Sequence, residues 1–176
     1  QFEDKFREVY SDEYKKNKSI HFSSASEMRE FYEDGLNILN YFKKNKGKYF
    51  SKRGWHLVGC ELPIVINPNP QYPSILYKGY LDLVLYNENT DKHKIIDFKT
   101  SKKEKSEEYI LNYFMQATAY CEMFEERTGI PINQIVLCFA LVEGGSQIIV
   151  KQKHDYLQPL NEYIDYYWSG IHEEYA

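Results

Sequence analysis

The sequence predicts an α+β fold in which helices pack on a central mixed β-sheet. Apolar residues recur at helical spacing near the start, in the middle and at the end of the chain. Between these segments lie alternating or continuous apolar runs that are typical of strands. The resulting order is helix, three strands, helix, two strands, helix. This order differs from the regular strand–helix alternation of a doubly wound parallel sheet.

The composition agrees with a single domain that spans residues 1–176. Hydrophobic residues make up 43% and charged residues 27%, which argues against a mainly disordered chain. No stretch is apolar enough for a membrane span, and the N-terminus is not a signal peptide. We therefore expect no membrane partner, and the scattered cysteines favour a reducing intracellular location, in the cytoplasm or nucleoid or, for a viral protein, in the host cell. Because the chain begins with Gln1, we expect an upstream segment to be missing.

The cysteines argue against a cluster or a disulfide framework. Cys60, Cys121 and Cys138 are odd in number, widely spaced and never in a CxxC pair. We expect no disulfide framework, zinc site or iron–sulfur cluster built from them.

The N-terminal helical part, residues 1–53, contains a predicted helix from about Ser26 to Lys46. Ser24 and Glu27 have capping-box spacing. One helical face carries Met28, Phe31, Gly35, Leu39 and Phe42. A basic stretch follows at Lys43, Lys44, Lys46, Lys48, Lys52 and Arg53. It is either a solvated helix end that complements the helix dipole or a phosphate-contacting patch.

The predicted core, residues 54–151, begins with three strands. Apolar residues alternate in the first strand at Val58, Cys60, Leu62, Ile64 and Ile66. This alternation places Glu61 on the opposite face. A proline-rich stretch breaks the chain, and strands at residues 75–86 and 94–100 follow. We expect these two strands to form an antiparallel hairpin.

A long helix and two further strands complete this core. The helix runs from about Ser106 to Arg127, and Gly129 and Pro131 end it. Its apolar stripe is Ile110, Phe114, Ala117, Cys121 and Phe124. Strands follow at residues 134–142 and 147–151. The C-terminal helix, in residues 152–176, is predicted from about His154 to Trp168.

The segment IIDFKT carries the clearest chemical signal. Asp97 and Lys99 are two residues apart in a predicted strand and share one face. We expect Ile96 and Phe98 to point into the core from the other face. Burying a carboxylate beside an ammonium group is costly unless something uses the charges.

Two further acids interrupt the preceding apolar strands. Glu61 lies in the first predicted strand and Asp82 in the second. Each acid alone fits a strand-end or ion-pair role. Three acids on consecutive strands, however, can converge on one patch of the sheet. Hard cations such as Mg²⁺ and Mn²⁺ prefer oxygen ligands, so together with Lys99 these acids favour a divalent metal site.

The long helix adds Gln116 and Tyr120, which lie on one face at i, i+4 spacing. Alone they fit an ordinary amphipathic face. Directly after the strand with Asp97, they are consistent with a polar wall for a substrate backbone.

The pattern E…GYLDLVL…KIIDFKTS…QATAY, over residues 61–120, resembles the PD-(D/E)xK nuclease superfamily. It is most similar to the RecB-like exonuclease branch. Within that branch it resembles the mitochondrial genome-maintenance type, whose DWKTS and QxxAY motifs are similar to DFKTS and QATAY here. The resemblance implies a restriction-endonuclease-like core, a central mixed sheet flanked by helices. It also implies phosphodiester hydrolysis in DNA replication or repair.

The resemblance implies specific roles for these residues. The metal ligands, for Mg²⁺ or Mn²⁺, would be Glu61, Asp82, Asp97 and the backbone carbonyl of Phe98. Lys99 would position or polarise the attacking water, while Gln116 and Tyr120 would orient the substrate. The catalytic set is then Glu61, Asp82, Asp97, Lys99, Gln116 and Tyr120.

Two departures from the family pattern concern cofactors. RecB-like enzymes often carry a metal-binding histidine on an early helix, and His21 and His56 are the candidates here. Neither has the expected helix context, and we expect His56 to be a surface or packing residue. The cysteine quartet of the iron–sulfur members is absent, so no cluster is expected.

The resemblance therefore predicts a Mg²⁺- or Mn²⁺-dependent deoxyribonuclease, an exonuclease on single-stranded or end-processed DNA. A helicase or another replication or recombination protein is a candidate partner. A net charge of −4 is unusual for a nucleic-acid-binding protein, so local basic patches would contact DNA. These are Lys43, Lys44, Lys46, Lys48, Lys52 and Arg53, with Lys102 and Lys103. A structure-specific endonuclease and a non-catalytic nucleic-acid-binding scaffold stay open as alternatives.

Overall fold

The computed structural model describes residues 2–17, 22–45, 54–68 and 76–175. Its sheet has the order β1-β2-β3-β4-β5. The strands are β1 (Trp55–Ile66), β2 (Tyr77–Asn87), β3 (Lys92–Ser101), β4 (Ile132–Leu141) and β5 (Ser146–Gln152). β3 and β4 are parallel, and the other neighbours are antiparallel. The predicted mixed sheet and the β2–β3 hairpin are therefore confirmed.

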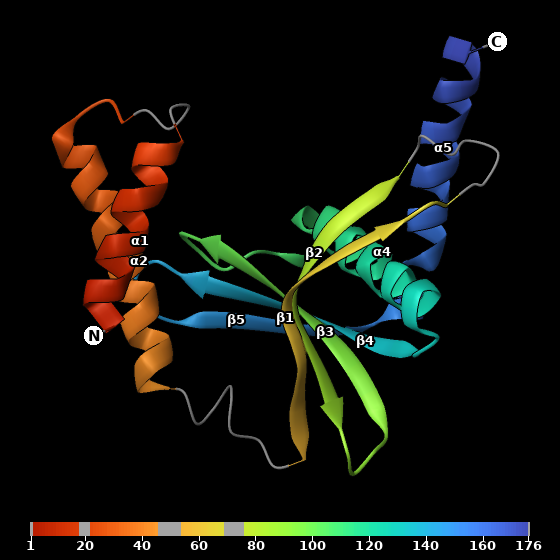
Figure 1. Ribbon diagram of the computed structural model, residues 1–176, viewed down its shortest axis with the longest axis horizontal. Coiled ribbons are helices and arrows are strands. Elements are labelled where there is room, and N and C mark those ends of the chain that lie inside the picture. Colours follow the sequence, from red (N-terminus) through yellow and green to blue (C-terminus); the bar gives the residue numbers. More distant parts are fainter. Residues whose placement is uncertain (1, 18–21, 46–53, 69–75, 176) are drawn as a thin grey trace.

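Helices flank this sheet, as predicted (Figure 1). They are α1 (Phe2–Lys16), α2 (Ala25–Lys44), α4 (Leu111–Thr128) and α5 (Leu157–Tyr175). The short 3₁₀ helices η1 (Glu107–Tyr109) and η2 (Lys153–Tyr156) precede α4 and α5. Figure 1 shows α1 and α2 side by side, on the side toward which β3 and β4 point. α5 lies on the opposite side.

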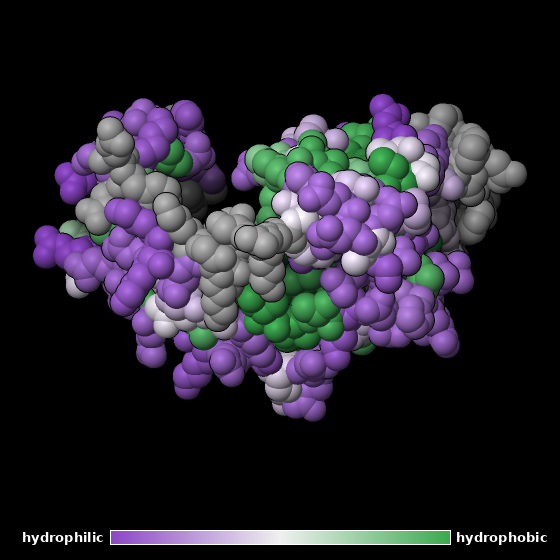
Figure 2. Space-filling view, turned by 90° about the horizontal axis from the view of Figure 1, so that it is seen from below, coloured by the Kyte–Doolittle hydropathy of each residue, from purple (hydrophilic) through white to green (hydrophobic). Residues whose placement is uncertain are grey.

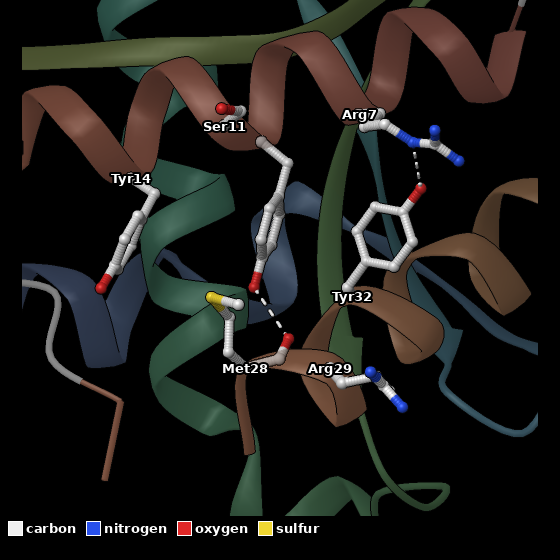
Figure 3. A pocket seen from close by; sticks show the side chains of 7 residues that line it. Arg7, Ser11, Tyr14, Met28, Arg29 and Tyr32 are labelled. Atoms are coloured by element: carbon white, nitrogen blue, oxygen red, sulfur yellow. Dashed lines mark hydrogen bonds between the residues drawn. The ribbon is translucent and has the colours of Figure 1, made fainter. Parts of the chain in front are cut away.

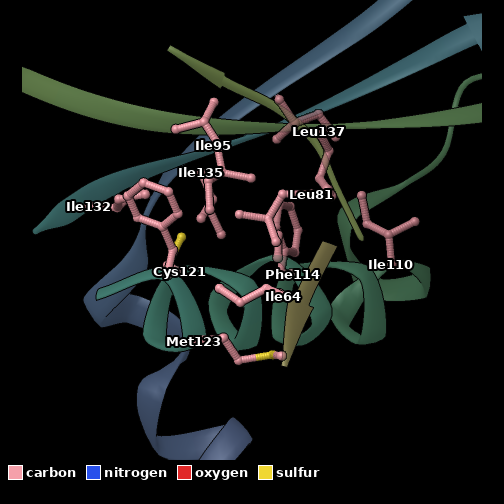
Figure 4. Packing of buried hydrophobic residues seen from close by; sticks show 14 of the residues in the cluster. Ile64, Leu81, Ile95, Ile110, Phe114, Cys121, Met123, Ile132, Ile135 and Leu137 are labelled. Carbon is pink, nitrogen blue, oxygen red and sulfur yellow. The ribbon is translucent and has the colours of Figure 1, made fainter. Parts of the chain in front are cut away.

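The core lies between the sheet and α4 (Figure 4). The predicted stripe of α4 is confirmed, since Ile110, Phe114, Ala117, Cys121 and Phe124 are all buried. They pack against strand residues such as Leu81, Ile95 and Ile135. α4 ends at Gly129 as expected, because that glycine adopts a left-handed φ of 71° and its amide donates to the Glu125 carbonyl.

The face of β3 that meets this core differs from the prediction. Ile95 and Asp97 are buried, whereas Ile96 is only partly buried and Phe98 is 36% exposed. Asp97 therefore points toward the side that α4 covers, and the expectation that Ile96 and Phe98 enter the core is wrong. β3 carries apolar residues on both faces, Ile95 on one and Ile96 with Phe98 on the other. Its sequence pattern alone therefore does not tell which face a helix covers.

The alternation predicted for β1 holds only in its second half. Leu62, Ile64 and Ile66 belong to the core or pack against it, but Val58 and Cys60 are exposed. The β1–β2 register shifts between Leu57 and Gly59, and Glu61 has a left-handed φ of 48°. Each irregularity turns the following residues to the other face, which sequence periodicity does not reveal.

The N-terminal part is a helical hairpin. α2 agrees with the predicted helix, but α1 was not predicted as a separate element. At the start of α2, the Glu27 amide donates to Ser24 Oγ at 3.1 Å, as the capping-box spacing predicted. The Glu27 carboxylate accepts from the amide and hydroxyl of Ser23. No described residue of α2 is buried, so this hairpin contributes little to the main core.

Apolar side chains remain on the surface. Figure 2, seen from below, shows them gathered in the middle of one face, with hydrophilic residues around them. Exposed apolar strand residues include Leu57, Ile148 and Val150. Within the described residues, none of the helices has the length and apolar character needed to cross a bilayer.

Candidate active site

Asp82 is held where β2 and β3 stop pairing. Their last paired residues in this direction are Leu83 and Ile96. Beyond that pair, the Phe98 amide donates a hydrogen bond to Asp82 Oδ2 at 2.7 Å. A side-chain carboxylate thus replaces the backbone carbonyl as acceptor, which fixes Asp82 at the point where the two strands separate.

Asp97 is a nearly buried carboxylate, 3% exposed. Lys99 Nζ lies 2.6 Å from its Oδ2 and is itself largely shielded. Among the described residues, no group meets the geometry of a hydrogen bond to this Oδ2, so its contact with Lys99 is ionic. Burial raises the pKa of Asp97, the Lys99 charge opposes that rise, and the Asp82 carboxylate adds to it.

Tyr120 of α4 faces the same charges. Burial raises its pKa, and the nearby carboxylates of Asp97 and Asp82 add to the rise, while Lys99 opposes it. Gln116 Nε2 donates to the Tyr120 hydroxyl at 3.2 Å, so these two residues act as a pair. The ring lies against β2, since a Cβ on Gly79 would stand 2.5 Å from a ring carbon of Tyr120.

Tyr113 joins this site and was not among the predicted site residues. Lys99 Nζ lies 5.4 Å from the centroid of the Tyr113 ring, within the range of a cation–π contact. The ring is supported by Phe139 at a centroid distance of 5.9 Å. The signal in the sequence is spacing, because Tyr113 shares one helical face with Gln116 and Tyr120.

Glu61 of β1 lies across from Asp82 of β2 in the strand ladder. It stands between the ladder pairs Cys60–Leu83 and Leu62–Leu81, as Asp82 does on the neighbouring strand. Its side chain is exposed and its backbone has a φ of 48°. Across the described ranges, no three His, Cys, Asp or Glu side chains are grouped to hold a metal.

The remaining pair, Asp82 and Asp97, still fits a divalent cation. Mg²⁺ commonly uses one or two carboxylates and completes its shell with water and phosphate oxygens. Within the described structure, the buried Oδ2 of Asp97 has no partner in hydrogen-bond geometry and keeps only its ionic contact with Lys99, so it can still offer a lone pair to a metal. The metal-ligand roles of Glu61 and the Phe98 carbonyl stay predictions.

The structure describes one of the two candidate histidines, His56, which pairs across the β1–β2 ladder with Tyr86 and not with Asp82. His56 is exposed, and its Nε2 lies 3.0 Å from Glu88 Oε2, which confirms the expected surface position. His21 falls outside the described residues.

The predicted DNA-contacting lysines are only partly described. Lys43 and Lys44 are exposed in the last turn of α2, and Lys102 and Lys103 are exposed just after β3. The other predicted basic residues, Lys46, Lys48, Lys52 and Arg53, lie outside the described residues.

The loop that carries Lys102 and Lys103 is tied to the sheet at both ends. Ser101 Oγ donates to the Lys103 carbonyl at 2.5 Å. Gln147 of β5 bonds the backbone amide and carbonyl of Lys105, each at 2.8 Å. The loop therefore holds these exposed lysines close to the end of β3.

Comparisons with known proteins give a family and a fold. A family model described as the PD-(D/E)XK nuclease superfamily matches residues 6–175. A crystal structure from Eubacterium rectale, described as a putative exonuclease, matches with a TM-score of 0.59 and 16% identity. The match covers 97% of this chain and 63% of that one, so this chain spans less than two thirds of its length.

A second solved structure, SSO0001, matches with a TM-score of 0.39 and 17% identity, over 72% of this chain and 56% of that chain. No curated protein matches the chain.

Proposed function

The chain belongs to the PD-(D/E)XK nuclease superfamily, and on this premise we propose that it is a metal-dependent DNA nuclease. We propose further that it is a RecB-like exonuclease, of the mitochondrial genome-maintenance type, acting on single-stranded or end-processed DNA. The observation that carries the proposal is the buried Asp97 carboxylate, in ionic contact with Lys99 and close to Asp82 and Tyr120.

Asp82 and Asp97 are the residues that would hold Mg²⁺ or Mn²⁺. Family resemblance adds Glu61 and the Phe98 carbonyl as further ligands. When bound, such an ion would lower the pKa of a coordinated water and offset negative charge on the phosphodiester. The hydrogen bond from the Phe98 amide to Asp82 Oδ2 leaves the other oxygen of that carboxylate to face a cation.

Lys99 would orient the attacking water. Its ammonium group has three N–H donors and lies in ionic contact with Asp97, and the Tyr113 ring beside it limits where the side chain can move. A cation held between a carboxylate and an aromatic face needs little reorganisation before it donates to water or phosphate.

Tyr120 and Gln116 would orient the phosphodiester. Because Gln116 donates to the Tyr120 hydroxyl, that hydroxyl can direct its own proton to a phosphate oxygen. The raised pKa of Tyr120 keeps this proton in place at neutral pH. The exposed lysines in the last turn of α2 and just after β3 would contact phosphates of the same strand. We also propose that the protein works with a helicase or another replication or recombination protein, in the cytoplasm or nucleoid.

The test is a gel assay with end-labelled single-stranded, linear duplex and closed circular DNA, each with Mg²⁺, Mn²⁺ or EDTA. We expect metal-dependent shortening of linear strands and intact circles. Asp97→Ala and Lys99→Ala should lower the rate on the order of 100-fold or more, as loss of a metal ligand or a proton-handling group does. Matched controls are Asp165→Ala and Lys92→Ala, which change exposed residues and should keep full activity.

Cutting without metal, or full activity in Asp97→Ala, would contradict the proposal. Cutting of closed circles would replace the exonuclease by an endonuclease on the same site. DNA binding without any cutting would instead favour the alternative function, a non-catalytic nucleic-acid-binding scaffold.

A further inference from the structure

A pocket lies between α1 and α2, on elements that contribute none of the proposed catalytic residues. It encloses about 320 Å³ and is lined by Arg7, Tyr10, Ser11, Tyr14, Met28, Arg29 and Tyr32. Figure 3 shows Tyr14 extending from α1 toward the space between the helices, with Met28 and Tyr32 entering it from α2. Its volume is at the small end of the range for sites that bind small ligands.

Two aromatic groups stand on either side of this pocket. Phe6, Tyr10 and Tyr32 form one group, with ring centroids 5.4–5.8 Å apart. Tyr14, Phe22 and Phe31 form the other, with successive centroids 5.6 and 5.7 Å apart. Among the described residues, no ring contact joins the two groups. The two groups of aromatic rings are therefore separated at the pocket, between Tyr10 and Tyr14.

The residues around this gap are accessible. Tyr14 and Met28 are 42% and 37% exposed. Tyr10 reaches from α1 across to α2, where its hydroxyl donates to the Met28 carbonyl at 3.3 Å. The gap therefore offers ring faces and a thioether to a flat aromatic ligand, which would gain stacking on entering it.

The charge of the lining fits a ligand that also carries phosphate. The lining includes two arginines and no acid. Arg29 is exposed, and Arg7 Nε donates to the Tyr32 hydroxyl at 3.4 Å, which orients its guanidinium group. By helical spacing, Glu27, Glu30 and Asp34 lie on the far side of α2, and Glu33, one turn after Arg29, is the acid of α2 on the same side as that arginine. Aromatic faces with arginine beside them are the usual means of holding a single strand of nucleic acid.

The hairpin is connected to the catalytic strand by one described aromatic contact. The ring of Phe42, in α2, meets Phe98, beside Asp97, at a centroid distance of 6.5 Å. Tyr32 and Met28 precede Phe42 by 10 and 14 residues, about 15–21 Å along the helix at 1.5 Å per residue. A strand stacked at about 3.4 Å per nucleotide would cover that length with about five nucleotides.

We propose that this pocket is a second DNA site, in which a base of a single strand stacks between Tyr10 and Tyr14 while its phosphate meets Arg29 and Arg7. The inference rests on the proposed nuclease function and adds a contact several nucleotides from the scissile bond. A strand long enough to span both sites would gain affinity that a very short strand would not.

The test measures binding of a fluorescent 12-nucleotide oligothymidine by anisotropy in EDTA, and cutting of a 3-nucleotide and a 12-nucleotide strand with Mn²⁺. Tyr14→Ser and Arg29→Gln should each weaken 12-nucleotide binding on the order of 10-fold, while 3-nucleotide cutting stays unchanged. Tyr14→Phe, which keeps the ring, should bind like the unchanged protein. Tyr166→Ser and Arg127→Gln are matched controls at exposed positions outside the hairpin, and unfolding temperatures report on the fold.

The outcomes separate this inference from the proposed function. If Tyr14→Ser and Arg29→Gln both bind the 12-nucleotide strand as the unchanged protein does, and the protein cuts DNA, the pocket is not a DNA site. The proposed nuclease function then stands. Equal losses in Tyr166→Ser and Arg127→Gln also overturn the DNA site in the pocket. If only the pocket variants lose 12-nucleotide binding and the unchanged protein cuts neither strand, the DNA site in the pocket is supported and the proposed nuclease function is overturned. A preference for oligouridine over oligothymidine overturns DNA as the ligand.

Discussion

Asp97 is a carboxylate kept where a charge is unfavourable. It is 3% exposed, its Oδ2 lacks a hydrogen bond within the described structure, and its one close cation, Lys99, is held by the Tyr113 ring as well. Such an arrangement costs stability because Lys99 only partly offsets the penalty of burying the charge. The same features make the carboxylate available to a metal, so stability and activity make opposite demands at this residue.

The pH dependence of stability follows from this burial. Because burial raises the pKa of Asp97 above its usual 3.8, the folded protein holds that proton more tightly than the unfolded chain. The contribution of Asp97 to the free energy of unfolding therefore falls as pH rises from about 3.8 through the raised pKa, and is constant above it.

We expect Asp97→Asn to raise the unfolding temperature at pH 7 in EDTA, by an amount that shrinks as the pH is lowered to about 4. Mn²⁺ should raise the unfolding temperature of the unchanged protein and have little effect on the variant, because ligand binding stabilises only a state with an intact site. Calorimetry from pH 4 to 8 measures both effects. Asp165→Asn is the exposed control, and a variant less stable than the unchanged protein at pH 7 would contradict the argument.

At the scale of elements, irregularities in β1 and β2 shape the site. The ladder skips Glu61 and Asp82, and the strands continue beyond them with their core-facing positions shifted. Gly79 of β2 then lies under the ring of Tyr120, where a side chain has no room. The geometry of the candidate site thus depends on how α4 packs on β2 as well as on the strands that carry the acids.

We expect Gly79→Ala to displace Tyr120, because the new Cβ would lie 2.5 Å from a ring carbon that must then move. A shift of about 1 Å in an orienting group can cost on the order of 100-fold in rate, so nuclease activity should fall by about 10- to 100-fold. Steady-state cutting of a single strand measures it, with circular dichroism as a check on folding.

Gly170→Ala is the matched control for this change. A Cβ at Gly170, in α5, meets nothing within 4 Å, so full activity is expected. Full activity in Gly79→Ala would show that the position of Tyr120 does not matter for cutting.

At the scale of the whole molecule, the chain has a closely packed body and a less closely packed α1–α2 hairpin. The body is the sheet with α4, and α5 is attached to it through Lys153, whose Nζ lies 2.7 Å from both Glu122 and Glu125 of α4. Glu125 also accepts from the Ile132 amide, which ties α4 to the start of β4. The described residues of the α1–α2 hairpin form no comparable core, so we expect the hairpin to open at lower free energy.

Hydrogen exchange on two variants, each with one phenylalanine truncated to alanine, tests whether these two regions unfold separately. Phe114→Ala removes a buried ring of α4 and should lower the free energy of unfolding by about 3–5 kcal/mol. Protection of α4 and β4 amides should fall accordingly, while α1 and α2 amides change little. Phe31→Ala, on the exposed hairpin, should do the reverse. Equal changes in both regions for both variants would mean that the domain unfolds as one unit.

The sequence by itself determined the order of the elements from α2 onward, the buried stripe of α4 and the grouping of Asp82, Asp97, Lys99, Gln116 and Tyr120. These follow from periodicity and motif spacing, which are local properties of the chain. Only the tertiary structure decided which face of β3 is covered, so Phe98 and not Asp97 is exposed. It also decided the position of Glu61 and the part played by Tyr113. Those depend on a bulge, a left-handed residue and a neighbouring helix, and such features become defined only when strands and helices pack together.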